Sequence, residues 1–388
     1  MVVGGGISGL AAAHFLSGTA RVTLLEQADR VGGKLRAAEL AGVRVDIGAE
    51  AMLARRPEGL ELAEQVGLAD HVQAASTTSA GLWLGGLRPL PAGTVMGIPA
   101  DLAAVAQAGV LSDGALAAAA DEAATTHPTL DEDVSVGALV RQRLGGEVVD
   151  RLVDPLLGGV YAATADGLSL RATIPALAAE LTEHGSLVDA ARAVNAATAS
   201  ATGPLFVSFP GGLASLAEAV ARGRFEIRTR AAVRGLRRTP EAFALEFGPT
   251  PQAQAVTADA VVVALPAGKA APLLREVSPA AAAELAGIES TSVAVISLAY
   301  RDARLPPGSG FLVPASASRA VKGVTFTSQK WPGYPSGLSL LRASVGRSDQ
   351  TRVLQRDDAD LVALVRHELR GLIGLTEDPL DALVTRWG

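Results

Sequence analysis

The feature that most constrains the fold of this chain is a cluster of glycines close to its start. The first residues are MVVGGGISGLAAAHFL, with Gly4, Gly6 and Gly9 in the spacing G-x-G-x-x-G. In a nucleotide-binding turn the first glycine permits a tight bend and the second lets the backbone approach a pyrophosphate. The third lets a helix pack closely on the sheet. The alternative is a glycine-rich turn without a ligand. The residues on either side of the turn distinguish these two interpretations.

The residues around this turn predict a strand, a helix and a second strand. Val2-Val3 predicts the end of a buried strand, residues 10–16 a helix, and residues 22–25 another buried strand. Glu26 ends that strand 17 residues after the last glycine of the motif, near the spacing of an acid that binds a ribose hydroxyl. We therefore expect the start of a doubly wound α/β sheet. The free N–H groups and the positive dipole end of its first helix would face the phosphates.

The identity of the nucleotide follows from the acid and from a second glycine pair. Glu26 favours a free 2′-hydroxyl and would repel a 2′-phosphate, so FAD and NAD are preferred to NADP. For Glu26 alone, a solvated carboxylate at a strand end is the alternative. Gly32-Gly33 follows within RVGGK, and an NAD-binding turn has no need of a glycine pair directly after the acid. The sequence therefore predicts FAD.

Composition excludes several other classes of protein. The 388 residues are 49% hydrophobic, which is enough for a large core in two or three domains. The net charge of −6 argues against a nucleic-acid partner. The chain has no cysteine, which excludes disulfides, thiolate metal sites and cysteine nucleophiles and fits a cytoplasmic location. Its histidines never fall four residues apart, and we expect no metal site. We expect neither a transmembrane helix nor a secretory signal.

The rest of the chain alternates between strand-like and helix-like regions, so the domains are expected to interleave. An Ala- and Leu-rich stretch over residues 99–200 predicts helices. Residues 206–209, 225–230 and 243–247 suggest an antiparallel meander, and residues 260–266 a buried strand closed by proline. Further predicted strands cover 43–47, 293–299, 310–313, 324–327 and 338–345, and further helices 57–69 and 357–372.

The run E-x-x-x-R-x-G-G-K at residues 26–34 resembles that of the flavin-binding amine oxidase superfamily. Longer segments are similar to one branch of it, the Gram-positive, particularly actinobacterial, coproporphyrinogen III and protoporphyrinogen oxidases of haem synthesis. The resemblance covers nearly the whole chain. The segments that carry it are residues 46–52, 90–99, 154–162, 168–187, 209–213 and 322–331.

The resemblance implies a FAD site made by the glycine turn, the acid, the second glycine pair and the segment that wraps the isoalloxazine. Its expected members are Gly4, Gly5, Gly6, Ile7, Ser8, Gly9, Glu26, Gln27, Gly33, Lys34, Gly48, Ala49, Glu50, Ala51, Met52 and, through its backbone, Val233. His14, on the first helix, is expected to be structural.

A substrate that bears propionates needs basic partners, because charge-assisted hydrogen bonds are the stronger ones. The candidate cations are Arg55, Arg56, Lys322 and Lys330, with a solvated place on the surface as the alternative for each. We expect Lys322, Lys330, Met96 and Tyr161 to bind substrate, with ordinary core packing as the alternative for the last two. No catalytic acid or base is expected, because the flavin carries the redox chemistry.

The family implies an α/β (α+β) fold in which a Rossmann-like FAD-binding domain is interleaved with a mixed-sheet substrate domain and a helical module. The expected boundaries are 1–70 and 204–275 for the FAD-binding domain, 71–98 and 276–388 for the substrate domain, and 99–203 for the helical module. Family members continue past the point where this sequence ends, and its first strand is short. We therefore expect the C-terminal FAD segment to be missing.

The activity that the resemblance implies is the oxidation of coproporphyrinogen III to coproporphyrin III in haem biosynthesis. Six electrons leave the substrate in three flavin cycles, and O2 is reduced to H2O2. The expected partners are the porphyrinogen and O2; a hand-over of product to a ferrochelatase and a weak peripheral membrane contact stay open. The alternatives are a protoporphyrinogen IX oxidase, another flavin amine oxidase or desaturase, and a truncated inactive fragment that binds nucleotide.

Overall fold

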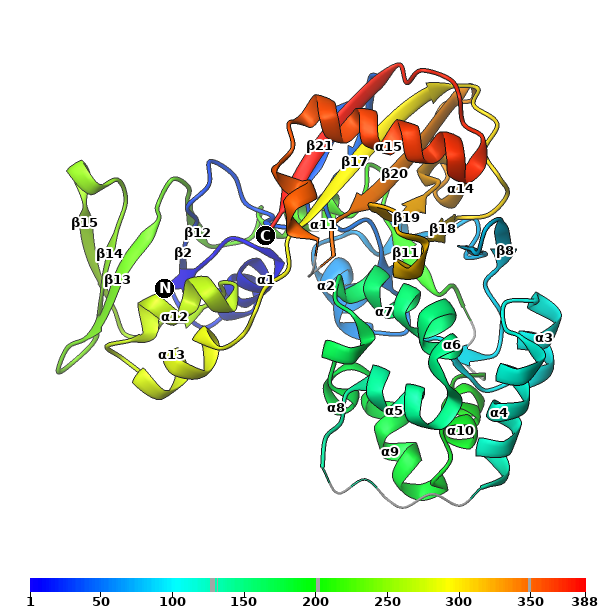
Figure 1. Cartoon of the computed structure of the whole chain (residues 1–388). Coiled ribbons are helices and arrows are strands. Elements are labelled where there is room, and N and C mark those ends of the chain that lie inside the picture. The colour runs from blue at the N-terminus through cyan, green and yellow to red at the C-terminus, as the bar shows by residue number, and fades with distance from the viewer. Residues whose placement is uncertain (126–129, 131, 200–202, 348–349) are drawn as a thin grey trace. The chain divides into compact units, whose positions relative to one another are not determined.

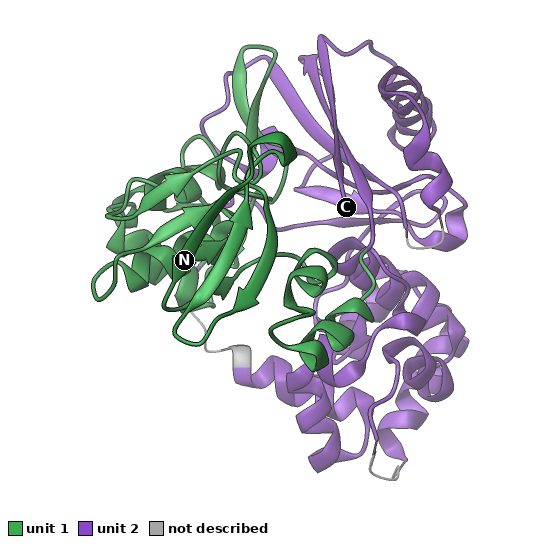
Figure 2. Ribbon diagram, turned by 90° about the vertical axis from the view of Figure 1, so that its left-hand side faces the viewer, with its two compact units in different colours: residues 1–74, 204–290 green, residues 75–203, 291–388 purple. Residues whose placement is uncertain are grey.

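The computed structural model describes residues 1–388 except 126–129, 131, 200–202 and 348–349 (Figure 1). The chain forms two compact units, each made of two separate segments (Figure 2). Unit 1 comprises Met1–Ala74 and Pro204–Ser290, and unit 2 comprises Ala75–Gly203 and Thr291–Gly388. The helical module and the substrate domain that the sequence predicts as separate bodies share unit 2.

Unit 1 is built on a parallel sheet of four strands in the order β12-β2-β1-β16. The strands are β1 (Val2–Val3), β2 (Thr23–Leu25), β12 (Glu226–Arg228) and β16 (Val262–Val263). Helix α1 (Ile7–Leu16) follows β1 and buries Leu10 and Ala13 in the same core as Val2 and Leu24. This confirms the predicted doubly wound beginning.

The remainder of unit 1 consists of small antiparallel sheets and short helices. The strands are β3 (Ala37–Leu40), β4 (Val43–Asp46), β5 (Met52–Leu53), β6 (Gln73–Ala74), β11 (Phe206–Ser208), β13 (Val233–Arg238), β14 (Phe243–Phe247) and β15 (Gln254–Ala258). The helices are α2 (Pro57–Gln65), α11 (Ala214–Val220), α12 (Ala267–Leu274), α13 (Pro279–Ala286) and the 3-10 turns η1 (Ala69–His71) and η4 (Thr250–Gln252). The strands assemble into the sheets β13-β14-β15 and β5-β11-β6 and the hairpin β3-β4.

Two sequence predictions for unit 1 are wrong in detail. Residues 206–209 and 225–230 were expected to form an antiparallel meander with 243–247. Instead, β11 pairs with β5 and β6, and β12 pairs in parallel with β2, Ile227 opposite Leu24. The meander contains instead β13, whose sequence VRGLRR is too rich in arginine to show an apolar period. The strand expected over 260–266 is reduced to β16, because the chain turns into α12 directly after Pro266.

Unit 2 contains a seven-stranded mixed sheet in the order β21-β17-β20-β19-β18-β7-β8. The strands are β7 (Gly81–Trp83), β8 (Leu87–Pro89), β17 (Val293–Arg301), β18 (Gly310–Leu312), β19 (Val321–Thr325), β20 (Leu338–Val345) and β21 (Asp381–Trp387). Helix α15 (Asp358–Ile373) covers it (Figure 1), and buries Leu361, Val365 and Leu369 against strand residues such as Ile296 and Leu341. Shorter elements are η5 (Ala315–Ala317), α14 (Thr327–Lys330) and η6 (Thr351–Gln355).

The Ala- and Leu-rich stretch of unit 2 folds into the predicted helices around a separate apolar core. After the hairpin β9 (Thr94–Val95) and β10 (Ile98–Pro99) come α3 (Leu102–Ala108), α4 (Asp113–Ala124), α5 (Val136–Leu144), α6 (Gly146–Val148), the π-helical η2 (Val149–Val153), α7 (Asp154–Tyr161), η3 (Ala165–Gly167), α8 (Leu170–Thr173), α9 (Pro175–His184) and α10 (Leu187–Ala199). Within the described part of the chain, no helix has both the length and the apolar character needed to cross a membrane.

Candidate functional site

The glycine turn of unit 1 is a close-packed bend whose outer side is open. A Cβ placed on Gly9 would lie 1.9 Å from the carbonyl oxygen of Gly4, and a Cβ on Gly4 would lie 2.5 Å from that of Ala264. Gly4 also has φ +106°, which disfavours any side chain. A Cβ on Gly6, in contrast, would meet no atom within 4 Å. Two glycines are therefore required by packing, whereas the third lines free space.

The N-terminus of α1 opens at the same place. Gly6 is its N-cap, and the first intrahelical bond runs from the N–H of Leu10 to the carbonyl of Gly6, 2.9 Å. The N–H groups of Ile7 and Ser8 precede that bond and have no partner within the helix. Backbone donors, the positive end of the helix dipole and the free space beside Gly6 fit a pyrophosphate.

The second glycine pair packs directly on the first turn. The N–H of Gly32 donates to the carbonyl of Gly5 at 2.8 Å, and Gly6 and Gly32 form a parallel bridge. Gly33 has φ +56°, and a Cβ there would lie 3.0 Å from the Cα of Gly6. The two turns are thus in direct backbone contact with each other.

Glu26 contacts the first of these turns with its carboxylate. Its Oε2 accepts from the N–H of Gly5 at 2.6 Å, and its Oε1 accepts from the N–H of Ala28 at 2.8 Å. A carboxylate has about four acceptor positions, so Glu26 retains capacity for the hydroxyl groups of a ribose. Gln27 is exposed beside it. Val233 begins β13, two residues after Ala231, whose N–H donates to the carbonyl of Glu26 at 2.8 Å.

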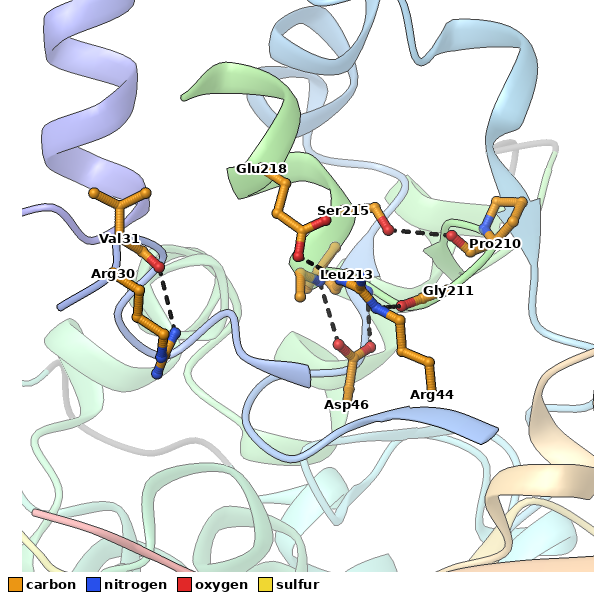
Figure 3. Close-up of polar contacts among 10 residues, drawn as sticks. Arg30, Val31, Arg44, Asp46, Pro210, Gly211, Leu213, Ser215 and Glu218 are labelled. Carbon is orange, nitrogen blue, oxygen red and sulfur yellow. Dashed lines mark hydrogen bonds and ion pairs between the residues drawn. The ribbon is translucent and has the colours of Figure 1, made fainter. Parts of the chain in front are cut away.

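Arginine side chains outside the predicted site lie near this turn. Burial first, and the charge of Arg36 second, lower the pKa of the Arg30 guanidinium. Arg30 also donates to the carbonyl of Val31 at 3.3 Å (Figure 3). The charges of Asp29 and Glu26 act on the Arg30 pKa in the opposite direction, so cations and carboxylates both lie near the second glycine pair. The signal in the sequence was the R-x-G-G-K-x-R spacing.

The segment predicted to wrap the isoalloxazine begins beside Lys34. The N–H of Ala49 donates to the carbonyl of Lys34 at 3.0 Å, and the N–H of Ile47 donates to that of Arg36 at 2.8 Å. Gly48, Ala49, Glu50 and Ala51 connect β4 to β5 and are partly or fully exposed. Met52 belongs to β5 and packs on α2, where its Sδ would lie 2.8 Å from a Cβ on Gly59.

Asp46 fixes the start of this segment to the turn before α11 (Figure 3). Its buried carboxylate accepts from the N–H of Leu213 at 2.7 Å and from that of Ala214 at 3.2 Å. Gly212 has φ +93°, and a Cβ there would lie 2.4 Å from Asp46 Oδ2. Arg44 donates from Nε to the carbonyl of Gly211 at 2.9 Å. Two segments that carry the family resemblance, 46–52 and 209–213, are therefore held together within unit 1.

Lys322, a candidate substrate cation, lies in unit 2 and is not a solvated surface residue. The residue is 6% exposed, and its Nζ donates to the carbonyl of Gly158 in α7 at 3.4 Å. Burial, with a smaller effect of Arg347, lowers the pKa of the Lys322 ammonium to about 8. Burial also raises the pKa of Asp154, which begins α7, against the opposing effects of the Ala165 N–H and of Arg347. No motif or spacing in the sequence pointed to Arg347.

The other candidates for the substrate site have different surroundings. Tyr161 ends α7, is 42% exposed, and donates from its hydroxyl to the carbonyl of Thr173 at 3.3 Å. Met96 lies at the tip of the β9-β10 hairpin with φ +49° and packs on the helical core. Lys330 places its Nζ 5.2 Å from the ring centre of Trp331. Arg55 and Arg56 are exposed in unit 1.

Comparison with known proteins identifies the family and the fold. The family model described as flavin containing amine oxidoreductase matches residues 7–388. The coproporphyrinogen III oxidase of Mycobacterium tuberculosis is 38% identical over 395 residues, which cover 100% of this chain and 85% of the relative. The coproporphyrinogen III oxidase of Bacillus subtilis is 30% identical, with 100% and 85% covered. A crystal structure described as a "putative protoporphyrinogen oxidase" from Exiguobacterium sp. 255-15 matches with a TM-score of 0.87 at 29% identity, covering 99% of this chain and 85% of that one.

Proposed function

The chain belongs to the family of flavin-containing amine oxidoreductases, and we propose that it oxidises coproporphyrinogen III to coproporphyrin III. It is an oxidoreductase, and its cofactor is FAD. The observation that carries the substrate assignment is the 38% identity to the mycobacterial coproporphyrinogen III oxidase along the whole of this chain. The free space beside Gly6 and the N–H groups at the start of α1 that have no partner within the helix support the cofactor assignment independently.

Particular residues of unit 1 would hold FAD. We assign the pyrophosphate to the backbone of Gly5, Gly6, Ile7 and Ser8, and a ribose hydroxyl of the adenosine to Glu26. Gly33 and Lys34, in the adjoining turn, would contact the same cofactor, and residues 48–52 would border the flavin ring. When bound, FAD supplies the acceptor for two electrons in each oxidation step.

The chain's own contribution to the reaction is to bind and orient the substrate. We propose that Tyr161 and Met96 border the macrocycle and that Lys330 pairs with a propionate. Lys322, unlike Lys330, does not pair with a propionate in this proposal. Its ammonium is buried against the carbonyl of Gly158, so it holds α7 in place and adds positive potential beside that helix. In this account no side chain exchanges a proton with the substrate.

The overall reaction balances with oxygen as the proposed final acceptor. Six electrons and six hydrogens leave the porphyrinogen, and three O2 become three H2O2. We also place the reaction in the cytoplasm, which the absence of cysteine allows. A second candidate substrate is protoporphyrinogen IX, which the name of the Exiguobacterium relative favours.

A direct comparison of substrates tests this function. The FAD-loaded chain is incubated in air with coproporphyrinogen III or protoporphyrinogen IX, while porphyrin fluorescence and H2O2 are followed. We expect faster porphyrin formation from coproporphyrinogen III, with three H2O2 per porphyrin. A preference for protoporphyrinogen IX would select the second candidate, and rates equal to autoxidation with both would exclude this function.

A further inference from the structure

A cavity of about 560 Å³ lies in unit 2 at the end of the mixed sheet where β18 turns into β19. Residues before, within and directly after η6, in the connection from β20 to α15, form its other side. Its polar lining consists of Ser318, Arg319, Gln350, Arg352 and Arg356, and the rest is alanine and valine. None of these residues belongs to the FAD or substrate positions assigned above.

The charge of this cavity is opposite to that of the chain. The whole sequence carries a net charge of −6, yet three arginines and no acid are found among the described residues of the lining. Two carboxylates on α15 are engaged elsewhere. Glu368 accepts from the N–H groups of Ala320 and Val321 at 2.9 and 2.8 Å, and Asp358 is ion-paired with Arg386.

The wall that carries Arg319 is held in place from behind. The buried guanidinium of Arg347 donates to the carbonyl of Arg319 at 3.2 Å and to that of Val313 at 2.7 Å, which closes the turn between β18 and β19. The guanidinium of Arg319 lies over the ring of Trp83, 5.7 Å from its centre. A wall fixed in this way loses little conformational entropy when a ligand binds.

Guanidinium groups match carboxylate and phosphate in shape, because both can accept two parallel hydrogen bonds. The hydroxyl of Ser318 and the amide of Gln350 add further hydrogen-bonding groups. The alanine and valine side chains suit a small organic body, and the volume falls within the range of small-molecule sites. A single monovalent anion would leave two of the three arginines without a counter-charge.

We propose that Arg319, Arg352 and Arg356 form a binding site for a small anion that carries at least two carboxylate or phosphate groups. Arg352 and Arg356 are exposed on the η6 side and would close on the anion, whereas Arg319 is already positioned by Trp83 and Arg347. The site is separate from the proposed reaction and does not depend on its substrate.

Calorimetric titration of the FAD-loaded chain tests the site, since bound FAD keeps the probes out of the pyrophosphate turn. The probes are citrate and pyrophosphate, with acetate as the monovalent control, at 50 mM salt. We expect citrate, pyrophosphate or both to bind at least tenfold more tightly than acetate. The double variant R352Q/R356Q should weaken that binding at least tenfold. A preference for citrate identifies carboxylates as the ligand class, and a preference for pyrophosphate identifies phosphates.

The matched control is R301Q/R304Q, which removes the same charge from two exposed arginines of unit 2 outside the cavity. Equal weakening by both double variants would mean that net charge alone governs binding, and would overturn the proposal. So would binding of citrate and pyrophosphate no tighter than that of acetate. Circular dichroism checks the fold of each variant. If R352Q/R356Q fails to fold, R352Q and R356Q are tested singly, each expected to weaken binding at least threefold.

Discussion

Replacing Gly6 and Gly9 separately by alanine distinguishes ligand binding from packing in the glycine turn. At Gly6 the backbone has φ −69°, which alanine adopts freely, and a Cβ meets no atom within 4 Å. Alanine is a poorer N-cap than glycine by about 0.5–1 kcal/mol, but it lowers the entropy of the unfolded chain by a comparable 0.4–1 kcal/mol. The FAD-free G6A variant should therefore unfold within about 1 kcal/mol of the wild type.

At Gly9 the added carbon would lie 1.9 Å from the carbonyl oxygen of Gly4, whereas real contacts of this kind exceed 3.0 Å. Helix α1 or the turn must move by roughly 1 Å, and overpacking of this kind costs about 1–3 kcal/mol or more. G9A should consequently lose about 2 kcal/mol of unfolding free energy, the middle of that range. In G6A the methyl group occupies space assigned to the pyrophosphate. The Kd of the G6A variant for FAD should rise at least tenfold, which corresponds to about 1.4 kcal/mol of binding free energy.

Urea unfolding of the FAD-free chains, followed by circular dichroism, gives the stabilities, and titration of flavin fluorescence gives the Kd for FAD. The two variants should separate cleanly, G6A losing FAD affinity and G9A losing stability. G6A that binds FAD as tightly as the wild type would refute the placement of the pyrophosphate. G6A as unstable as G9A would refute the claim that the space beside Gly6 is free.

Three other substitutions probe the same account. Asp46→Ala leaves the buried N–H groups of Leu213 and Ala214 unpaired and should cost about 2–4 kcal/mol in urea unfolding. The control Glu218→Gln removes only the exposed ion pair with Arg44 and should cost under ~0.5 kcal/mol. Equal losses in the two variants would contradict the anchoring role of Asp46. Glu26→Gln should raise the Kd for FAD about tenfold, through loss of a charge-assisted bond to ribose, and an unchanged Kd would place the ribose elsewhere. Lys322 has a pKa of about 8 in the folded chain against 10.5 when unfolded. The unfolded state therefore binds more protons between these values, and stability should rise with pH there by up to about 3 kcal/mol. Lys322→Met should abolish that rise. The difference between the stability–pH profiles of the wild type and the variant gives the contribution of Lys322. Two parallel profiles would show that Lys322 is not desolvated.

Local patterns in the sequence predicted much of the fold correctly. The glycine turn, the apolar strands of the mixed sheet and the amphipathic period of α15 all depend on residues close in sequence. The partner of a strand depends on distant residues, and there the sequence was less informative. The alternation in 225–230 predicts a strand but contains nothing that selects β2 as its parallel partner. Strand β21 went unpredicted, because as an edge strand it is half exposed and lacks a clear apolar face.

The candidate site shows the same division. Spacing alone predicted that Gly9 is needed for close packing, and a Cβ there would indeed meet the Gly4 carbonyl. The stacking of Gly33 on Gly6 could not be read from spacing, because it requires the path of the chain between them. The burial of Lys322 was missed for a related reason. The local sequence VKGVT does not show that α7, which is distant in the chain, contacts this lysine.

The proposed function of this chain is the oxidation of a porphyrinogen through bound FAD. Its most direct test is anaerobic mixing of the FAD-loaded chain, in excess, with coproporphyrinogen III, while flavin absorbance and porphyrin fluorescence are recorded together. Since six electrons leave each substrate and each FAD accepts two, we expect three flavins to bleach for every coproporphyrin III formed. Unbleached flavin with no porphyrin, or porphyrin formed without loss of flavin absorbance, would contradict it.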